Sequence, residues 1–330
     1  MEPKLFFPLL SGGRPKGVNS SGIANFKGDI SESLAREWAQ NAIDACYRSF
    51  PIEMDFELKL LKPTDLPCFG ELESAVRSCK AYWKDGHRQE IEFCDKALCR
   101  FAGNIPVLVI SDRGTTGLYG QDDDTNGRWF GLVESTETSV GDDSRGGSYG
   151  IGKNAAFAAS IFQTVYFSTR SIREEYAFKG VSILMTHLNT AGEKTQPDGA
   201  IGEATDSGYV RTIRDAEQIP PLFKRADHGL STFIPGYKPY YTNPDGWQNE
   251  LIASLLRNFW PAIHFGKVNF RVKNTDINKD TLESLMAKFA SYFGDANDYG
   301  APHLFYRVFT SANKRAFKGS LKHLKEVDLF

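Results

Sequence analysis

The sequence has no long hydrophobic run, few cysteines and no excess charge of one sign. Its most apolar N-terminal stretch, Leu5–Leu10, contains Pro8 and is too short for a signal peptide or a membrane span. With 39 Lys and Arg against 41 Asp and Glu, the net charge of −2 gives the whole chain no electrostatic preference for nucleic acid or an anionic membrane. We therefore expect no membrane partner.

The cysteines argue against both a disulfide framework and a zinc site. There are five of them, an odd number, with no Cys-x-x-Cys pair and no accompanying cluster of histidines. Buried, reduced thiols are the better interpretation. They predict a reducing, cytoplasmic environment.

Periodicity predicts an α/β chain. The 330 residues are enough for about two domains at roughly 150 residues each. The unbroken apolar run Ile105–Ile110 predicts a strand that is buried on both faces. Residues 189–207 are expected to form a polar loop. Helices are expected near 29–48, 70–84, 87–101 and 153–161, and strands near 54–60, 163–169, 175–184, 208–213 and 230–235.

A proline-containing loop at 237–246 predicts a domain boundary near residue 240. Beyond it the pattern predicts a helix at 247–259, a strand at 267–273, a helix at 280–293 and a strand at 303–309. The apolar residues Val327–Phe330 resemble the opening of a strand, which favours a C-terminal truncation over a short docked terminus. We expect one domain at 1–240 and a second, smaller α/β domain at 241–330.

The first chemical motif is Glu37-x-x-x-Asn41-x-x-Asp44-Ala45. Helical spacing places its two carboxylates and its amide on one face, where their oxygens suit a hydrated Mg²⁺ and a water nucleophile. Taken alone, the pattern is more often a solvated polar stripe.

The second motif follows the apolar strand as Ser111-Asp112-Arg-Gly114-Thr-Thr116-Gly117. A carboxylate at a strand end can accept a hydrogen bond from an amino group, and the glycines allow a flat ring or a phosphate to approach the backbone. An ordinary Asp/Gly turn is the alternative.

The third motif is Gly146-Gly147-Ser148-Tyr149-Gly150-Ile151-Gly152-Lys153-Asn154. Backbone N–H groups freed by glycine at the start of a helix bind polyanions, and Lys153 adds a charge that can reach a terminal phosphate. A Walker A loop is disfavoured, because Asn154 stands where that motif needs Ser or Thr and polar residues precede the first glycine.

The glycine-rich segment 112–150 is too long for a passive loop and predicts a functional lid. It has few apolar residues to fix one conformation. The acidic run Asp122–Asp124 within it is expected to be a solvated loop tip rather than a metal site.

The three motifs, in this order, resemble those of the GHKL ATPases. This superfamily includes gyrase B subunits, the large heat-shock chaperone, sensor histidine kinases, MutL and MORC proteins. The resemblance spans residues 18–236 and implies a Bergerat-type mixed sheet with helices on one face, followed by a smaller, transducer-like α/β domain. Within the superfamily, the chain resembles uncharacterised bacterial and MORC-like members.

The resemblance also implies roles for individual residues. Glu37 corresponds to the general base, Asn41 to a Mg²⁺ ligand and Asp112 to the acceptor for the adenine amino group. Asp44 supports the base-contacting network, and Lys153 caps the phosphates. The remaining residues implied at the nucleotide are Ala45, Gly114, Thr116, Gly117, Gly147, Ser148, Tyr149, Gly150, Ile151, Gly152 and Thr232.

Two departures from the family pattern affect the adenine side. The turn has one extra residue before Gly117, and the late Gly-Thr motif appears as Gly229-Leu-Ser231-Thr232. Ser231 and Thr232 are therefore alternative sources of its hydroxyl.

The implied function is Mg²⁺-dependent ATP binding and slow ATP hydrolysis that drive lid closure and a nucleotide-dependent homodimer. The setting implied is a bacterial defence or DNA-processing system, with a protein or DNA partner engaged through a missing C-terminal region. A non-hydrolytic nucleotide-gated module and a P-loop NTPase are the alternatives. No histidine precedes position 87, which disfavours a histidine kinase in cis. A γ-phosphate lysine from the second domain has three candidates, Lys273, Lys314 and Lys318. The basic run 313–325 is interpreted as a solvated face rather than a nucleic-acid contact.

Overall fold

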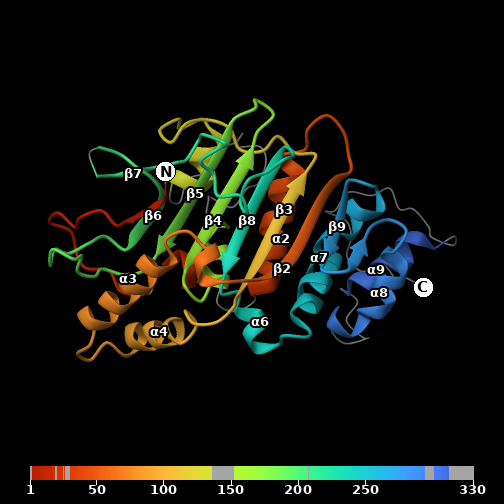
Figure 1. Ribbon diagram of the computed structural model, residues 1–330. Coiled ribbons are helices and arrows are strands. Elements are labelled where there is room, and N and C mark those ends of the chain that lie inside the picture. Colours follow the sequence, from red (N-terminus) through yellow and green to blue (C-terminus); the bar gives the residue numbers. More distant parts are fainter. Residues whose placement is uncertain are drawn as a thin grey trace, which may run out of the picture.

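A mixed sheet of ten strands forms the centre of the protein (Figure 1). This computed structural model describes residues 2–18, 21–24, 26, 30–135, 152–206, 208–293 and 301–311. The strand order is β1-β6-β5-β4-β8-β3-β2-β9-β10, and β7 pairs with β6 outside this path. Neighbouring strands are antiparallel except for β2 and β9, which run parallel.

The elements alternate along the chain as expected for an α/β protein. The strands are β1 (Lys4–Phe6), β2 (Ile52–Leu61), β3 (Ile105–Arg113), β4 (Thr164–Arg170), β5 (Tyr176–Ile183), β6 (Asp198–Ala204), β7 (Val210–Arg211), β8 (Gly229–Pro235), β9 (Val268–Val272) and β10 (Thr275–Ile277). The helices are α1 (Ser21–Ala24), α2 (Ile30–Asp44), α3 (Phe69–Tyr82), α4 (Arg88–Leu98), α5 (Asn154–Ala159), α6 (Lys238–Thr242), α7 (Trp247–His264), α8 (Leu282–Lys288) and α9 (Pro302–Thr310). A single π-helical turn, η2, covers Phe130–Glu134.

Helices cover both faces of the sheet, so the expectation of helices on one face is wrong. Strand β3 shows why: Leu108 and Ile110 join a core with α2, α5 and α7, whereas Val107 and Val109 join a second core with α3 and α4. Successive residues of a strand point to opposite faces, and β3 is apolar on both. The prediction that this strand is buried on two sides is confirmed.

The sheet continues across the expected boundary at residue 240. Strand β9 pairs with β2 in a register that runs from Ile52 opposite Val268 to Phe56 opposite Val272. Helix α7 packs in the same core as α2, and Arg257 Nη1 lies 2.9 Å from Glu32 Oε2 between these two helices. The described residues after 240 therefore extend the first sheet and its core.

Two segments differ from the sequence-based expectation. The expected loop at 189–207 contains β6, whose glycines and charged residues hide the strand pattern. The expected strand at 303–309 is helix α9, which begins at Pro302, a residue whose fixed φ suits a first helical position.

The cysteines are all free thiols, as predicted. Their burial varies: Cys79 and Cys94 are buried, whereas Cys99 is exposed. Among the described residues, no helix has the length and apolar character needed to cross a bilayer.

The shared core predicts that α7 and the central strands unfold together. Leu255→Ala removes a fully buried side chain of α7 and should destabilise the protein by about 2–5 kcal/mol. Hydrogen exchange should show α7, β2 and β3 losing protection at one common free energy. The matched change Leu60→Ala, at a half-exposed position of β2, should have little effect. Loss of protection in α7 and β9 alone would show that they form a separate domain.

Candidate functional site

Helix α2 is the element on which the sequence motifs meet. It buries Leu34, Trp38 and Ala42 against the sheet and leaves Asn41 and Asp44 exposed. The indole Nε1–H of Trp38 donates to Thr232 Oγ1 over 2.9 Å, which ties the helix to β8. The amphipathic spacing thus fixes which edge of α2 carries its polar residues, as predicted.

Glu37 lies directly against the backbone of the third motif. Its side chain is 14% exposed, and a Cβ built on Gly152 would lie only 1.8 Å from Glu37 Oε2. No real Cβ fits at that distance, so the absence of a side chain at Gly152 is what lets the carboxylate sit here. The first and third motifs are therefore in contact at the start of α5.

The other end of α2 is hydrogen-bonded to the second motif. The N–H of Thr116 donates to the carbonyl of Ala45, and the N–H of Tyr47 donates to the carbonyl of Gly114, each over 2.8 Å. Gly114 has φ +79°, a conformation that favours glycine. This short backbone ladder holds the turn after β3 against the C-terminus of the helix.

Asp112 is buried at the end of β3, on the α2 face of the sheet. It is 7% exposed and lies two residues beyond Ile110, so it shares that residue's face. Its Oδ1 accepts hydrogen bonds from Thr115 Oγ1 and from the N–H of Leu230. Burial raises the pKa of Asp112, whereas the nearby Arg225 guanidinium and these two hydrogen bonds act in the opposite direction.

The two candidate hydroxyls on β8 lie on opposite faces. Thr232 shares the face of Ile234 and α2, while Ser231 shares the face of Phe233 and hydrogen-bonds Ser111 Oγ over 2.9 Å. Only Thr232 is therefore on the side of Asp112. Gly229 has φ +138°, and a Cβ there would lie 2.3 Å from the carbonyl oxygen of Asp112.

Gly117 differs from what its motif predicts. A Cβ at this position would lie 2.6 Å from the carbonyl oxygen of Arg170, at the end of β4. The close approach that this glycine permits is thus to the chain itself. Thr116 beside it donates from Oγ1 to the Gly117 carbonyl over 3.0 Å and accepts from Arg128 Nη1 over 3.2 Å.

Lys153 also differs from expectation. Its side chain is buried, and Nζ donates to the carbonyls of Gly131 in η2 and of Ser135 just after it, so in this structure it does not stand free for a phosphate. Burial lowers the pKa of Lys153 to about 8, with Glu134 acting in the opposite direction.

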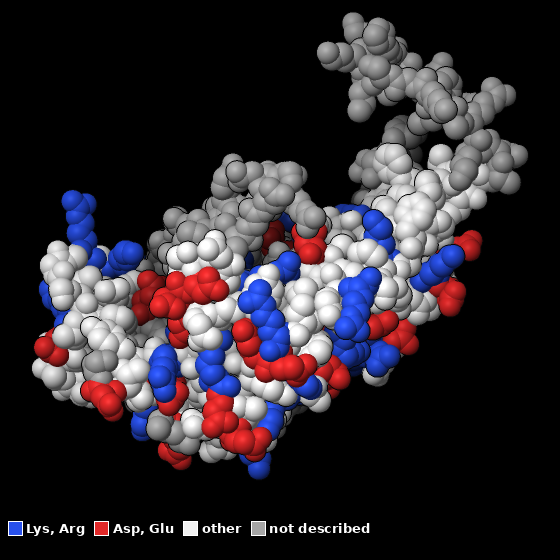
Figure 2. Space-filling view, turned by 90° about the horizontal axis from the view of Figure 1, so that it is seen from above, with Lys and Arg blue, Asp and Glu red and all other residues white. Residues whose placement is uncertain are grey.

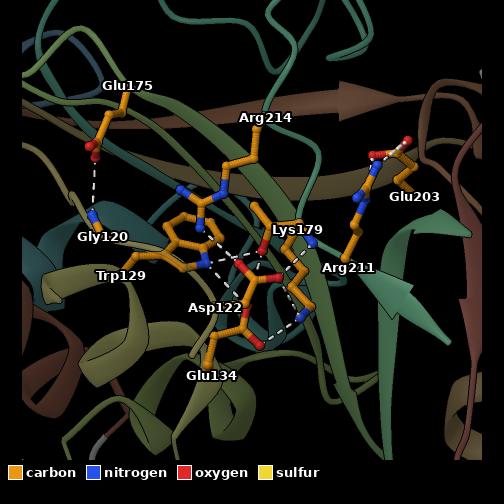
Figure 3. A network of polar contacts seen from close by, with 10 residues as sticks. Gly120, Asp122, Trp129, Glu134, Glu175, Lys179, Glu203, Arg211 and Arg214 are labelled. Carbon is orange, nitrogen blue, oxygen red and sulfur yellow. Dashed lines mark hydrogen bonds and ion pairs between the residues drawn. The ribbon is translucent and has the colours of Figure 1, made fainter. Parts of the chain in front are cut away.

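The first half of the expected lid is anchored by a polar network that the sequence analysis missed (Figure 3). Asp122, expected at a solvated loop tip, lies 2.8 Å from Arg214 and accepts from the N–H of Thr212. Glu134 Oε2 lies 2.6 Å from Lys179 Nζ, and the fully buried Trp129 donates to Glu134 Oε1. The segment therefore has the anchors that its composition appeared to lack, and no local pattern marks them.

The remaining predicted residues either lie outside the described part of the chain or make no hydrogen bond within it that joins them to another motif. Gly147, Ser148, Tyr149, Gly150 and Ile151 lie outside the described residues, as do Lys314, Lys318 and the basic run. Lys273 lies in the turn between β9 and β10. The exposed Asp44 accepts from Gln40 Nε2 within its own helix.

A cavity of about 450 Å³ lies beside this site rather than in it. Its apolar floor includes Phe157, Phe167 and Val181, and charged side chains including Lys153 and Glu134 line it. Among the predicted site residues that the structure describes, Lys153 alone borders it. The contacts around α2 locate the candidate site better, because they join separate motifs.

The surface charge agrees with the composition. Figure 2 shows the protein from above relative to Figure 1, and acidic and basic side chains are mixed over the described part of that face. Comparison with known proteins adds no assignment: no family model and no curated protein matches the chain.

The Glu134–Lys179 pair generates a stability prediction. Glu134→Gln leaves the Lys179 ammonium, 7% exposed, with only the Asp122 carboxylate, 4.0 Å away, as an anionic partner, and should cost up to about 3–5 kcal/mol. Thermal and urea unfolding measure this. Glu203→Gln is the matched control, because its partner Arg211 is 63% exposed, and it should barely change the melting temperature. Equal effects of the two substitutions would contradict the structural role of the network.

Proposed function

We propose that this protein binds ATP with Mg²⁺ and hydrolyses it slowly, as an ATPase of the GHKL type. The observation that carries the proposal is the convergence of three distant motifs on α2. Glu37 lies against Gly152 of the third motif. The backbone N–H groups of Thr116 and Tyr47 join the turn after β3 to the end of α2. Trp38 donates a hydrogen bond to Thr232 on β8. A helix that performed only packing would not need a glycine, an acidic turn and a polar strand residue at one place.

The donor set on α2 fits a hydrated Mg²⁺. Asn41 offers an exposed amide oxygen as the metal ligand, and one helical turn earlier the Glu37 carboxylate, in the space that Gly152 leaves, can accept a hydrogen bond from a water near the ion. Mg²⁺ keeps several water ligands and takes few protein oxygens. Bound there with the triphosphate, the ion would neutralise phosphate charge.

The chain's own residues account for the remaining steps. Glu37 holds the attacking water and takes its proton; its carboxylate, 14% exposed, is positioned for this by its confinement. Asp112 accepts a hydrogen bond from the adenine amino group and so selects adenine over a base that carries an oxo group there. Closure over the triphosphate and nucleotide-dependent dimerisation follow from the family resemblance and belong to the same proposal.

Glu37→Gln tests the assignment of the base. The amide keeps the size of the side chain and removes its basicity, so turnover should fall by about 10²–10⁴ while ATP affinity stays within a few-fold. Phosphate release and calorimetry measure the two quantities. Glu71→Gln, at an exposed position of α3 on the opposite face of the sheet, should change neither. Wild-type binding without turnover would favour the non-hydrolytic module.

Nucleotide-gated dimerisation has its own test. The chain should gain mass in light scattering with Mg²⁺ and a non-hydrolysable ATP analogue but not with Mg²⁺ and ADP, because only the triphosphate supplies the contacts for closure. An unchanged mass, with analogue binding confirmed by calorimetry, would overturn gated dimerisation and leave the ATP site standing.

A further inference from the structure

The carboxylate of Asp112 is held by a residue of the turn that is one residue longer than the family pattern. Thr115 follows Gly114 in the lengthened turn and is 2% exposed. Its Oγ1 accepts from the N–H of Gly117 over 3.4 Å and donates to Asp112 Oδ1. Because the hydroxyl accepts from the backbone on one side, its proton is directed to the carboxylate on the other.

The other contacts of Asp112 leave one oxygen for a ligand. The N–H of Leu230 also donates to Oδ1, over 3.2 Å, and Arg225 Nη2 donates to the main-chain carbonyl of Asp112 over 2.6 Å. Within the described part of the chain, the side-chain hydrogen bonds of Asp112 therefore all go to Oδ1. Oδ2 is the oxygen that can accept from an incoming amino group.

The backbone around this carboxylate is rigid on both sides. The Thr115 segment bridges Cys46 after α2, and Gly229 packs against the Asp112 carbonyl. Arg225, which also binds the Asp112 carbonyl, donates from Nη1 to Ser231 Oγ on β8 over 2.5 Å. The Thr115 hydroxyl and the Leu230 N–H, both bonded to Oδ1, then oppose rotation of the carboxylate.

We propose that Thr115 is a positioning residue for base recognition: its hydroxyl orients Asp112 so that Oδ2 accepts the 6-amino group of the purine. This inference rests on the proposed ATP site. It assigns Thr115, in the lengthened turn, to nucleotide selectivity, whereas a residue that only closed the turn would affect all nucleotides alike.

The test compares ATP with purine riboside triphosphate, which lacks the 6-amino group. Calorimetry should show the wild-type chain binding ATP at least about tenfold more tightly than the analogue. Thr115→Val keeps the shape and removes the hydroxyl, so it should weaken ATP about tenfold and change the analogue less than twofold. Thr115→Ser restores the hydroxyl and should keep wild-type selectivity.

Each outcome decides the question. Thr115→Val weakening both ligands equally, or neither, overturns the positioning role, and so does Thr115→Ser behaving like Thr115→Val. Melting curves check the fold of each variant, and Thr115→Ala replaces Thr115→Val should the latter not fold. If the wild-type chain does not bind ATP, the proposed function and this inference both fail. If it binds ATP but Thr115→Val leaves the ratio of ATP to analogue affinity unchanged, only this inference fails.

Discussion

The two-sided burial of β3 constrains the rest of the structure. A strand that is apolar on both faces needs cover on both, and α2 with α7 supplies one layer while α3 and α4 supply the other. The polar end of the same strand then lies between these layers. Asp112 consequently reaches the α2 face at low exposure, where one hydrogen bond has more effect than it would in water.

Two kinds of polar contact surround the site and serve different purposes. The contacts of α2 with the turn, with β8 and with Gly152 bring motif residues together. The second kind is the network of Asp122, Glu134, Lys179 and Arg214. It anchors the segment that follows the turn, through Asp122 and Glu134, to Lys179 in β5 and to Arg214 in the chain before β8. Lys153 connects these two sets of contacts, because it directly precedes α5 and its ammonium donates to the carbonyls of Gly131 and Ser135, in and just after η2. A change in the hydrogen-bond partners of Lys153 would therefore affect both the contacts of α2 and the network around Glu134.

Local pattern predicted the elements whose signal is local. The amphipathic spacing of α2, the helices α3 and α4 and the apolar run of β3 were all readable, and so was the polar edge of α2. Strand β6 was not, since Gly199 and Gly202 are there because Phe7 and Arg211 approach them closely, which is a long-range reason. The parallel pairing of β9 with β2 is equally non-local.

The same distinction holds at the site. Motif residues could be found by spacing, but their partners could not. Spacing indicates one extra residue in the turn before Gly117 and a loop tip at Asp122, but the contacts of Thr115 with the Asp112 carboxylate and of Asp122 with the Arg214 guanidinium are defined by folding. Lys153 was assigned by its place in a motif, and its carbonyl partners lie in a turn with no recognisable signature.

The short outer strands have a consequence for how this protein behaves in a crowded solution. Among the described residues, the strand path of the sheet ends in β1 on one side and β10 on the other, and each has only three residues, whereas the interior strands β2 and β3 have ten and nine. An outer strand offers its unpaired backbone groups as a template for another chain. A template of three residues limits the length over which another chain could pair with either edge, while the long apolar strands β2 and β3 are paired on both sides.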